Sequence, residues 1–254
     1  NANLVDKTFG PSPDMLHKWP GHQEVEIGLV KLYRVTGNEK YLNLAKHFLD
    51  VRGPRGGEYN QAHKKPVDQN EAVGHAVRAM YMYGGMADIA ALTGDERYAD
   101  ATKMLWDNVV SKKMYITGGL GAKSDGEAFG KDYNLPNATA YCETCAAIGS
   151  AMWNHRMFRL TGDAKYLDIF ERTLYNGLIS GVSLSGDRFF YVNPLESNGK
   201  HRREPWFGCA CCPPNVARFM ASLPGYVFAK TDDTIYVNLF AASETAIKLK
   251  NNTV

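Results

Sequence analysis

A short turn recurs along the chain and constrains the fold more than any other feature of the sequence. Thr-Gly followed by Asn or Asp occurs at residues 36–38, 93–95 and 161–163, and each time one residue separates it from a Lys-Tyr or Arg-Tyr pair. A pattern that returns at such intervals is typical of a fold assembled from repeated supersecondary units.

Each copy of the turn separates two amphipathic segments. Around the first copy these segments are Val25–Val35 and Tyr41–Leu49, and apolar residues at positions 41, 44, 45 and 48 share one face of a helix. Glycine ends a helix in the left-handed conformation, and Asn or Asp then caps the next helix. The repeat therefore predicts three αα-hairpins.

The connections between the hairpins favour a closed toroid over a superhelical solenoid. They are long and rich in glycine, at residues 53–70, 118–137 and 181–212. Compact solenoid repeats seldom carry such connections, whereas enzymes often place their chemistry on them. We expect a mainly α fold, a partial (α/α)₆ toroid of about three hairpins over residues 1–223.

A second pattern begins at residue 224. Thr234–Phe240 and Ala246–Lys250 read as strands, so residues 224–254 are predicted to begin a truncated β-rich, sandwich-like domain. A further strand is expected at Arg188–Leu195, within the helical region. The chain begins with Asn and ends in a strand-like stretch, so we expect it to be a fragment.

The balance of charge excludes some classes of partner. Lys and Arg number 29 against 27 Asp and Glu, and the net charge of +2 is not concentrated in blocks. This balance argues against a nucleic-acid partner or an anionic membrane surface. No apolar run approaches the length of a membrane helix, and the first residues lack the pattern of a signal peptide.

All five cysteines fall in two tight groups about 65 residues apart, after 141 residues without one. A secreted disulfide scaffold usually spreads its cysteines along a shorter chain. Two compact groups instead indicate two halves of one metal site with reduced thiols. The members are Cys142, Cys145, Cys209, Cys211 and Cys212.

Two ligand sets are compatible with these positions. If a helix begins at Asn137, Cys142 and Cys145 share a face, which favours a structural Cys₄ zinc site. The rival set uses Glu143 with Cys145 and requires an irregular first turn. In either case a metal with all its positions filled does not readily activate water, so it either supports the fold or presents a ligand thiolate as a nucleophile.

Other side chains could carry sugar chemistry. Glu127 lies in a glycine-rich loop beside Phe129, and a carboxyl near an aromatic ring suits a general acid, although a solvated loop glutamate is the simpler interpretation. His22 and His75 each begin a helix and could cap it or face a cavity, and Tyr191 could belong to the core or to a sugar site. The glycine-rich loop lacks the ending of a phosphate-binding loop, so we reject nucleotide binding.

Several consecutive motifs between Gly21 and Tyr226 resemble glycoside hydrolase family 127, which retaining bacterial β-L-arabinofuranosidases typify. The matching strings are GHAVRAMYMYGGMADIAALTGD, YITGGLGAKSDGEAFG, LPNATAYCETCAAIGSAMWNHRMFRLTGD, FFYVNPLES and WFGCACCPPNVARFMASLPGY. The resemblance implies an (α/α)₆ barrel that contains zinc and is followed by β-sandwich domains.

The resemblance also implies roles for individual residues. It places the zinc ligands at Glu143, Cys145, Cys211 and Cys212, and so chooses Glu143 over Cys142. It implies that Cys211 is the nucleophile, forming a thioglycosyl intermediate, and that Glu127 is the acid/base. Its sugar-contacting residues match His22, His75 and Tyr191.

We therefore expect a zinc-dependent retaining exo-glycosidase that releases terminal β-L-arabinofuranose from plant-type glycans. The alternatives are the same chemistry on another furanose-like sugar, or a non-catalytic helical module with a Cys₄ zinc. The expected partner is an oligosaccharide, and a homodimer through missing or C-terminal regions stays open. A bacterial cytoplasmic location is expected.

Overall fold

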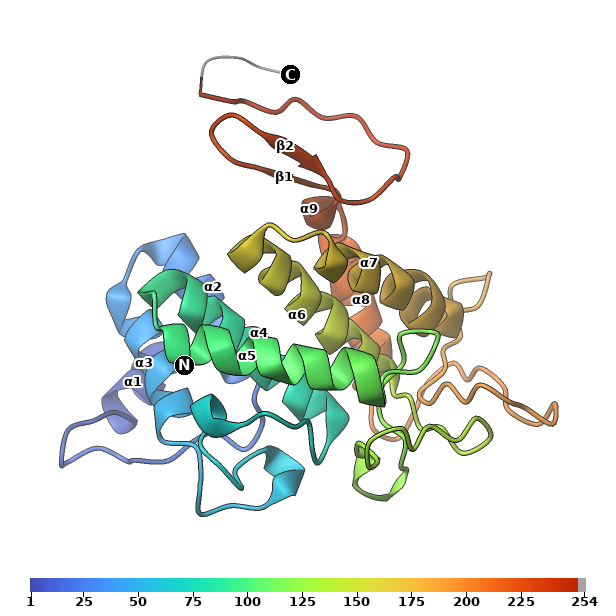
Figure 1. Ribbon diagram of the computed structural model, residues 1–254, viewed down its shortest axis with the longest axis horizontal. Helices are drawn as coiled ribbons and strands as arrows, with labels where there is room; N and C mark the ends of the chain where they lie inside the picture. Colours follow the sequence, from blue (N-terminus) through green and yellow to red (C-terminus); the bar gives the residue numbers. More distant parts are fainter. Residues whose placement is uncertain (251–254) are drawn as a thin grey trace.

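The computed structural model describes residues 1–250, and three helical hairpins form its main body (Figure 1). The pairs are α2 (Val25–Thr36) with α3 (Glu39–Asp50), α4 (Ala76–Thr93) with α5 (Glu96–Asn108), and α6 (Thr144–Thr161) with α7 (Lys165–Arg172). The mainly α class and the three predicted hairpins are confirmed.

Shorter elements surround the hairpins. The remaining helices are α1 (Ala2–Thr8), α8 (Cys212–Ser222) and α9 (Pro224–Val227). The 3₁₀ turns are η1 (Glu58–Asn60), η2 (Pro66–Asp68), η4 (Asp125–Glu127) and η6 (Ile179–Gly181), and two π-helical segments, η3 (Val109–Lys113) and η5 (Thr173–Leu178), follow α5 and α7.

The recurring turn has the same hydrogen bonds in all three hairpins. Gly37 ends α2 at a φ of 68°, and the corresponding glycines after α4 and α6 have φ values of 69° and 74°. In each turn the Thr hydroxyl donates to the carbonyl four residues earlier and accepts from the backbone N–H two residues later. The Asn or Asp side chain then accepts a hydrogen bond from the backbone N–H two residues later, where the next helix starts. Short-range chemistry therefore determines this end of every hairpin.

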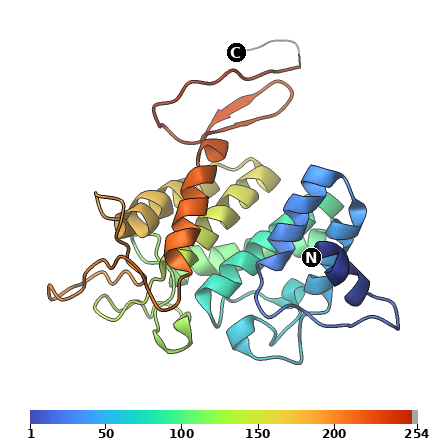
Figure 2. The same ribbon diagram turned by 180° about the vertical axis from the view of Figure 1, so that it is seen from behind.

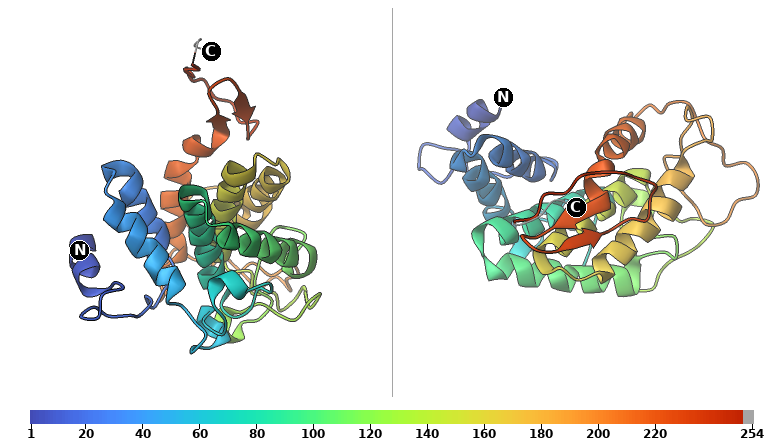
Figure 3. Two further views of the ribbon diagram at one scale, coloured as in Figure 1. Left: turned by 60° about the vertical axis from the view of Figure 1, so that its left-hand side comes forward. Right: turned by 90° about the horizontal axis from the view of Figure 1, so that it is seen from above.

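The core lies along a row of helices in the order α2, α4, α6 and α8, with α3, α5 and α7 packed outside it. Figures 2 and 3 show the row bend into an arc, as expected of part of a toroid. Helix α4 is buried from Ala76 to Ala90, except at Arg78, because it packs between neighbours on both sides. A Cβ built on Gly149 of α6 would lie 2.8 Å from Met80 Cβ, so a glycine is required where α4 and α6 approach.

Three details of the predicted elements are wrong. The helix expected from Asn137 begins at Thr144. Arg188–Leu195 is not a strand, because its backbone bonds to neighbouring loops: Phe190 N–H donates to Gly181 O and Asn193 N–H to Tyr141 O. No strand is formed at 246–250 within the described residues.

The last regular elements of the described chain form a small antiparallel hairpin. Strand β1 (Phe228–Lys230) pairs with β2 (Ile235–Val237), which is shorter than the predicted strand at 234–240. The last four residues of the predicted β-rich region lie outside the described residues, and the division of the chain at residue 223 stays a prediction. Within residues 1–250, none of the helices is both long and apolar enough to cross a bilayer.

Candidate active site

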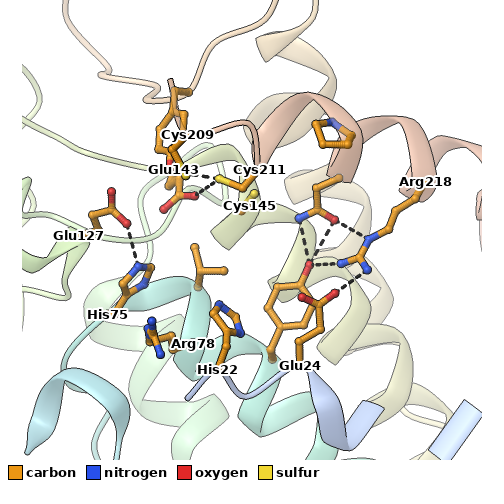
Figure 4. A pocket seen from close by; sticks show the side chains of 15 residues that line it. His22, Glu24, His75, Arg78, Glu127, Glu143, Cys145, Cys209, Cys211 and Arg218 are labelled. Carbon is orange, nitrogen blue, oxygen red and sulfur yellow. Dashed lines mark hydrogen bonds and ion pairs between the residues drawn. The ribbon is translucent and has the colours of Figure 1, made fainter. Parts of the chain in front are cut away.

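The N-terminal ends of the inner helices meet at one pocket (Figure 4). His75, Glu143 and Cys211 are the N-cap residues of α4, α6 and α8, and none of them makes a side-chain capping bond to its own helix. Their side chains therefore remain available to the pocket, which has a volume of about 450 Å³. The positive ends of three helix dipoles lie beside it, and these favour anionic groups.

The segment before α6 decides which side chains enter the pocket. Cys142 has a left-handed φ of 42°, and its side chain packs next to Gly119, in a separate buried cluster with Tyr115, Ala122 and Ala140. The expectation that Cys142 and Cys145 share a helix face is wrong, because Cys142 precedes the helix. The irregular entrance required by the rival ligand set is present.

Glu143, Cys145, Cys211 and Cys212 form a compact group whose donor atoms all lie within 4.8 Å of one another. The Sγ atoms of Cys145 and Cys212 are 3.4 Å apart, those of Cys211 and Cys212 are 3.8 Å apart, and all the cysteines are free. These separations are much longer than a disulfide bond. The group could bind a metal ion.

The donor set fits a tetrahedral thiophilic ion. With metal–sulfur bonds of about 2.3 Å, tetrahedral zinc places its sulfur ligands about 3.8 Å apart. Glu143 Oε1 lies 3.6 Å from both Cys211 Sγ and Cys212 Sγ, whereas the buried Glu143 Oε2 has no hydrogen-bond partner among the described residues. An unpartnered carboxylate oxygen beside three thiols is the arrangement that a cation would complete.

Burial and neighbouring anions control ionisation in this group. Burial, followed by the proximity of Cys211 and Glu127, raises the pKa of Glu143 to about 9. Hydrogen bonds with Cys145 and Cys212 lower the pKa of Cys211, which is half-buried at the pocket wall. The pKa of Cys212 is raised, chiefly by its hydrogen bonds with Cys145 and Cys211. Among the three thiols of the group, Cys211 is the least buried, because Cys145 and Cys212 are both buried.

Glu127 lies on the opposite side of Glu143 from the thiols. Its Oε2 is 2.7 Å from His75 Nε2, and its Oε1 accepts a hydrogen bond of 2.6 Å from the Tyr141 hydroxyl. Donor atoms of Glu127, His75 and Glu143 all lie within 4.8 Å of one another. Phe129, the expected apolar neighbour, is buried in the core. Glu143 thus belongs to both groups and joins the loop carboxyl to the thiols.

The remaining predicted residues line the same pocket. The Tyr191 hydroxyl lies 3.1 Å from Cys211 Sγ. His22 is next to Tyr81, with ring centroids 6.0 Å apart, and its pKa is lowered mainly by burial. Burial also lowers the pKa of His75, despite the nearby Glu127. The structure therefore brings together all eight predicted site residues, with Cys212 buried behind the wall.

Sequence reasoning missed several residues of the pocket. Arg218 contacts Glu24 at 2.5 Å and donates to the Tyr81 hydroxyl and to Asn215 Oδ1 at 2.8 and 2.9 Å. Asn215 and Arg218 follow Cys211 by four and seven positions, a helical period that could have revealed them. Tyr141, which does not line the pocket but contacts Glu127, carried no such signal, because the expected helix placed it on a regular turn.

The fold and the pocket define a helical-toroid domain with a thiol and carboxylate site, and comparison with known proteins gives its family. A family model described as "Beta-L-arabinofuranosidase, GH127 catalytic domain" matches residues 2–225. The chain belongs to this family. It is 38% identical over 265 residues to a non-reducing end beta-L-arabinofuranosidase of Bifidobacterium longum subsp. longum.

Solved structures of similar proteins have the same fold. A GH127 beta-arabinofuranosidase superposes with a TM-score of 0.96 at 59% identity over 99% of this chain. A GH127 beta-L-arabinofuranosidase from Geobacillus stearothermophilus T6 gives 0.96 at 44% identity, also over 99% of this chain. The match to the Bifidobacterium relative covers 91% of this chain but only 40% of the relative. The two solved chains are covered to 40% and 45% of their own lengths.

Proposed function

We propose that this domain is the catalytic part of a retaining exo-glycosidase that releases terminal β-L-arabinofuranose from plant-type glycans. The carrying observation is the single pocket in which Cys211 and Glu127 lie on either side of Glu143. A nucleophile and a proton donor that face one cavity are the two groups that retention requires. The names of the relatives support arabinofuranose as the sugar.

Cys211 is the nucleophile of the proposal, and Glu127 is the acid/base. In the first step the Cys211 sulfur attacks the anomeric carbon, the bond from that carbon to the leaving oxygen breaks, and Glu127 gives its proton to this oxygen. In the second step water attacks the same carbon and gives a proton to Glu127, and the electron pair of the carbon–sulfur bond returns to sulfur. Two inversions give overall retention.

Glu143, Cys145, Cys211 and Cys212 would hold Zn²⁺. When bound, the ion supplies the positive charge that keeps thiol ligands ionised and reverses the effect of burial on Glu143. The N-terminus of α8 acts in the same direction, because Cys211 occupies the N-cap position and a helix N-terminus favours a thiolate.

His22, His75 and Tyr191 would bind the sugar. They supply ring faces and hydrogen-bonding groups around the pocket.

The test uses the full-length protein on p-nitrophenyl α- and β-L-arabinofuranosides, with and without a chelator. We expect hydrolysis of the β anomer and loss of activity after metal removal. Cys211→Ser and Glu127→Ala should each lower kcat/KM by at least about 10³-fold, and only Cys211→Ser should prevent covalent trapping by an activated glycoside.

Cys142→Ser is the matched control, because this thiol lies outside both the pocket and the four-donor group, in the separate cluster with Tyr115. It should retain both activity and trapping. Normal turnover by Cys211→Ser would remove the thiolate from the mechanism. If neither anomer is hydrolysed, another furanose-like sugar becomes the next candidate before another class of reaction.

A further inference from the structure

Tyr141 makes a hydrogen bond that the roles assigned above leave unexplained. Its hydroxyl donates to Glu127 Oε1 over 2.6 Å, while His75 Nε2 lies 2.7 Å from Oε2. Each carboxyl oxygen therefore has its own partner, one on the segment before α6 and one at the start of α4. Contacts at both oxygens fix the plane of the carboxyl group as well as its position.

Glu127 has little support from its own segment. It ends the 3₁₀ turn η4 with a left-handed φ of 49°, follows a glycine with a φ of 66°, and its side chain is 32% exposed. A carboxyl on such a turn rotates readily unless other elements hold it. The orientation of Glu127 therefore depends on Tyr141 and His75.

Tyr141, in contrast, is held firmly. Its carbonyl accepts from Asn193 N–H at 3.1 Å, and the Asn193 side chain donates to the next carbonyl, that of Cys142, at 2.8 Å. The N–H of Cys142 donates to Gly121 O at 2.9 Å. The backbone on both sides of the Tyr141–Cys142 peptide is thus fixed by two separate loops.

The same contacts relate Tyr141 to the thiol. Its ring packs edge-on against Tyr191, with centroids 6.4 Å apart, and the Tyr191 hydroxyl lies 3.1 Å from Cys211 Sγ. Thr144 N–H donates to Tyr191 O at 2.9 Å, which ties the two tyrosine segments together. The pair of rings therefore spans from the proton-donating carboxyl to the sulfur.

We propose that Tyr141 is a positioning residue for proton transfer, whose hydroxyl holds Glu127 by Oε1 so that Oε2 carries the proton to the leaving oxygen. This inference rests on the proposed function. A tyrosine hydroxyl is an O–H donor at neutral pH, and the bond of 2.6 Å to Oε1 uses this donor. His75 Nε2 holds the other oxygen, Oε2, at 2.7 Å, so the carboxyl keeps one orientation between the two contacts.

The test compares two leaving groups in the full-length protein. Methyl β-L-arabinofuranoside needs its leaving oxygen protonated, whereas 2,4-dinitrophenyl β-L-arabinofuranoside does not. We expect Tyr141→Phe to lower kcat/KM by about 10- to 100-fold on the methyl glycoside and by less than about 3-fold on the dinitrophenyl glycoside. Glu127→Ala should show the same pattern with a larger loss on the methyl glycoside.

Tyr115→Phe is the matched control, because it removes the hydroxyl of a nearby buried tyrosine that donates to Pro136 O at 3.2 Å. It should leave both substrates unaffected. An equal loss on the two substrates in Tyr141→Phe, or no loss on the methyl glycoside, would overturn the positioning role. Failure of the unaltered protein to cleave either glycoside would instead contradict the proposed function.

Discussion

The two ends of the inner helices α2, α4 and α6 are built on different principles. At their C-terminal ends the same Thr-Gly turn occurs three times, with glycine φ values of 68°, 69° and 74° and the same side-chain bonds. At the N-terminal ends of α4 and α6 the caps are His75 and Glu143, and neither makes a capping bond through its side chain.

The C-terminal ends of these helices therefore contribute to stability, whereas the N-terminal ends supply side chains for the pocket. Residues of the turns satisfy one another locally, so they contribute to folding wherever the hairpin is placed. Residues at the opposite end leave helix N–H groups and their own polar atoms without local partners, including Glu143 Oε2 and His75 Nδ1 within the described chain. The N-terminal end therefore lacks the stabilisation of side-chain capping bonds, and its side chains are free to contact a ligand.

The largest expected effect is the loss of metal when a donor at the N-terminal end of α6 is removed. Under the zinc site proposed above, Glu143→Ala removes one of the four donors, so elemental analysis of the purified full-length protein should show loss of most of the metal, and the proposed activity should fall with it. Cys142→Ala is the control and should retain both, because Cys142 lies in the separate cluster with Tyr115. The reverse pattern would favour the Cys₄ site.

A smaller effect should appear in stability at the turn end. Gly37→Ala forces a Cβ into the left-handed conformation and should destabilise the helical domain by about 1–2 kcal/mol in denaturant unfolding, with kcat unchanged. Gly28→Ala, in the same helix, should be neutral or stabilise by up to about 1 kcal/mol. At both glycines a Cβ meets no described atom within 4 Å, so the pair isolates backbone conformation. Equal stabilities would show that the turn does not need this conformation.

The smallest effect depends on pH. The hydrogen bond from Arg97 lowers the pKa of Asp95 from 3.8 to about 2, so the ionised carboxyl stabilises the folded chain above about pH 4, and this contribution is lost as the pH falls toward 2. Asp95→Asn keeps an oxygen for the cap, as Asn38 does in the first turn, and should cost less than about 1 kcal/mol at pH 7.

The variant should also show a smaller loss of melting temperature between pH 4 and 2 than the unaltered protein. Asp163→Asn is the comparison, because the same cap has only a longer ion pair of 3.4 Å with Lys165. An unchanged pH profile in Asp95→Asn would show that the Arg97 pair contributes nothing to folding.

Several features of the site could be predicted from residues close together in the sequence. Cys211 and Cys212 are adjacent and Glu143 and Cys145 are two apart, so each half of the donor group is visible in a short motif. The choice between Cys142 and Glu143 was not visible in that way. Helical spacing favoured Cys142, and only the resemblance to the family pointed to Glu143.

The sequence by itself determined the three hairpins, because glycine conformation, Thr and Asx capping and amphipathic spacing act within a few residues. Tertiary structure alone decided that Cys142 turns away from the donors and that Tyr141 meets Glu127. Those outcomes depend on contacts of the 141–144 segment with Gly121 and Asn193, and no local pattern encodes a contact between loops so far apart in the chain.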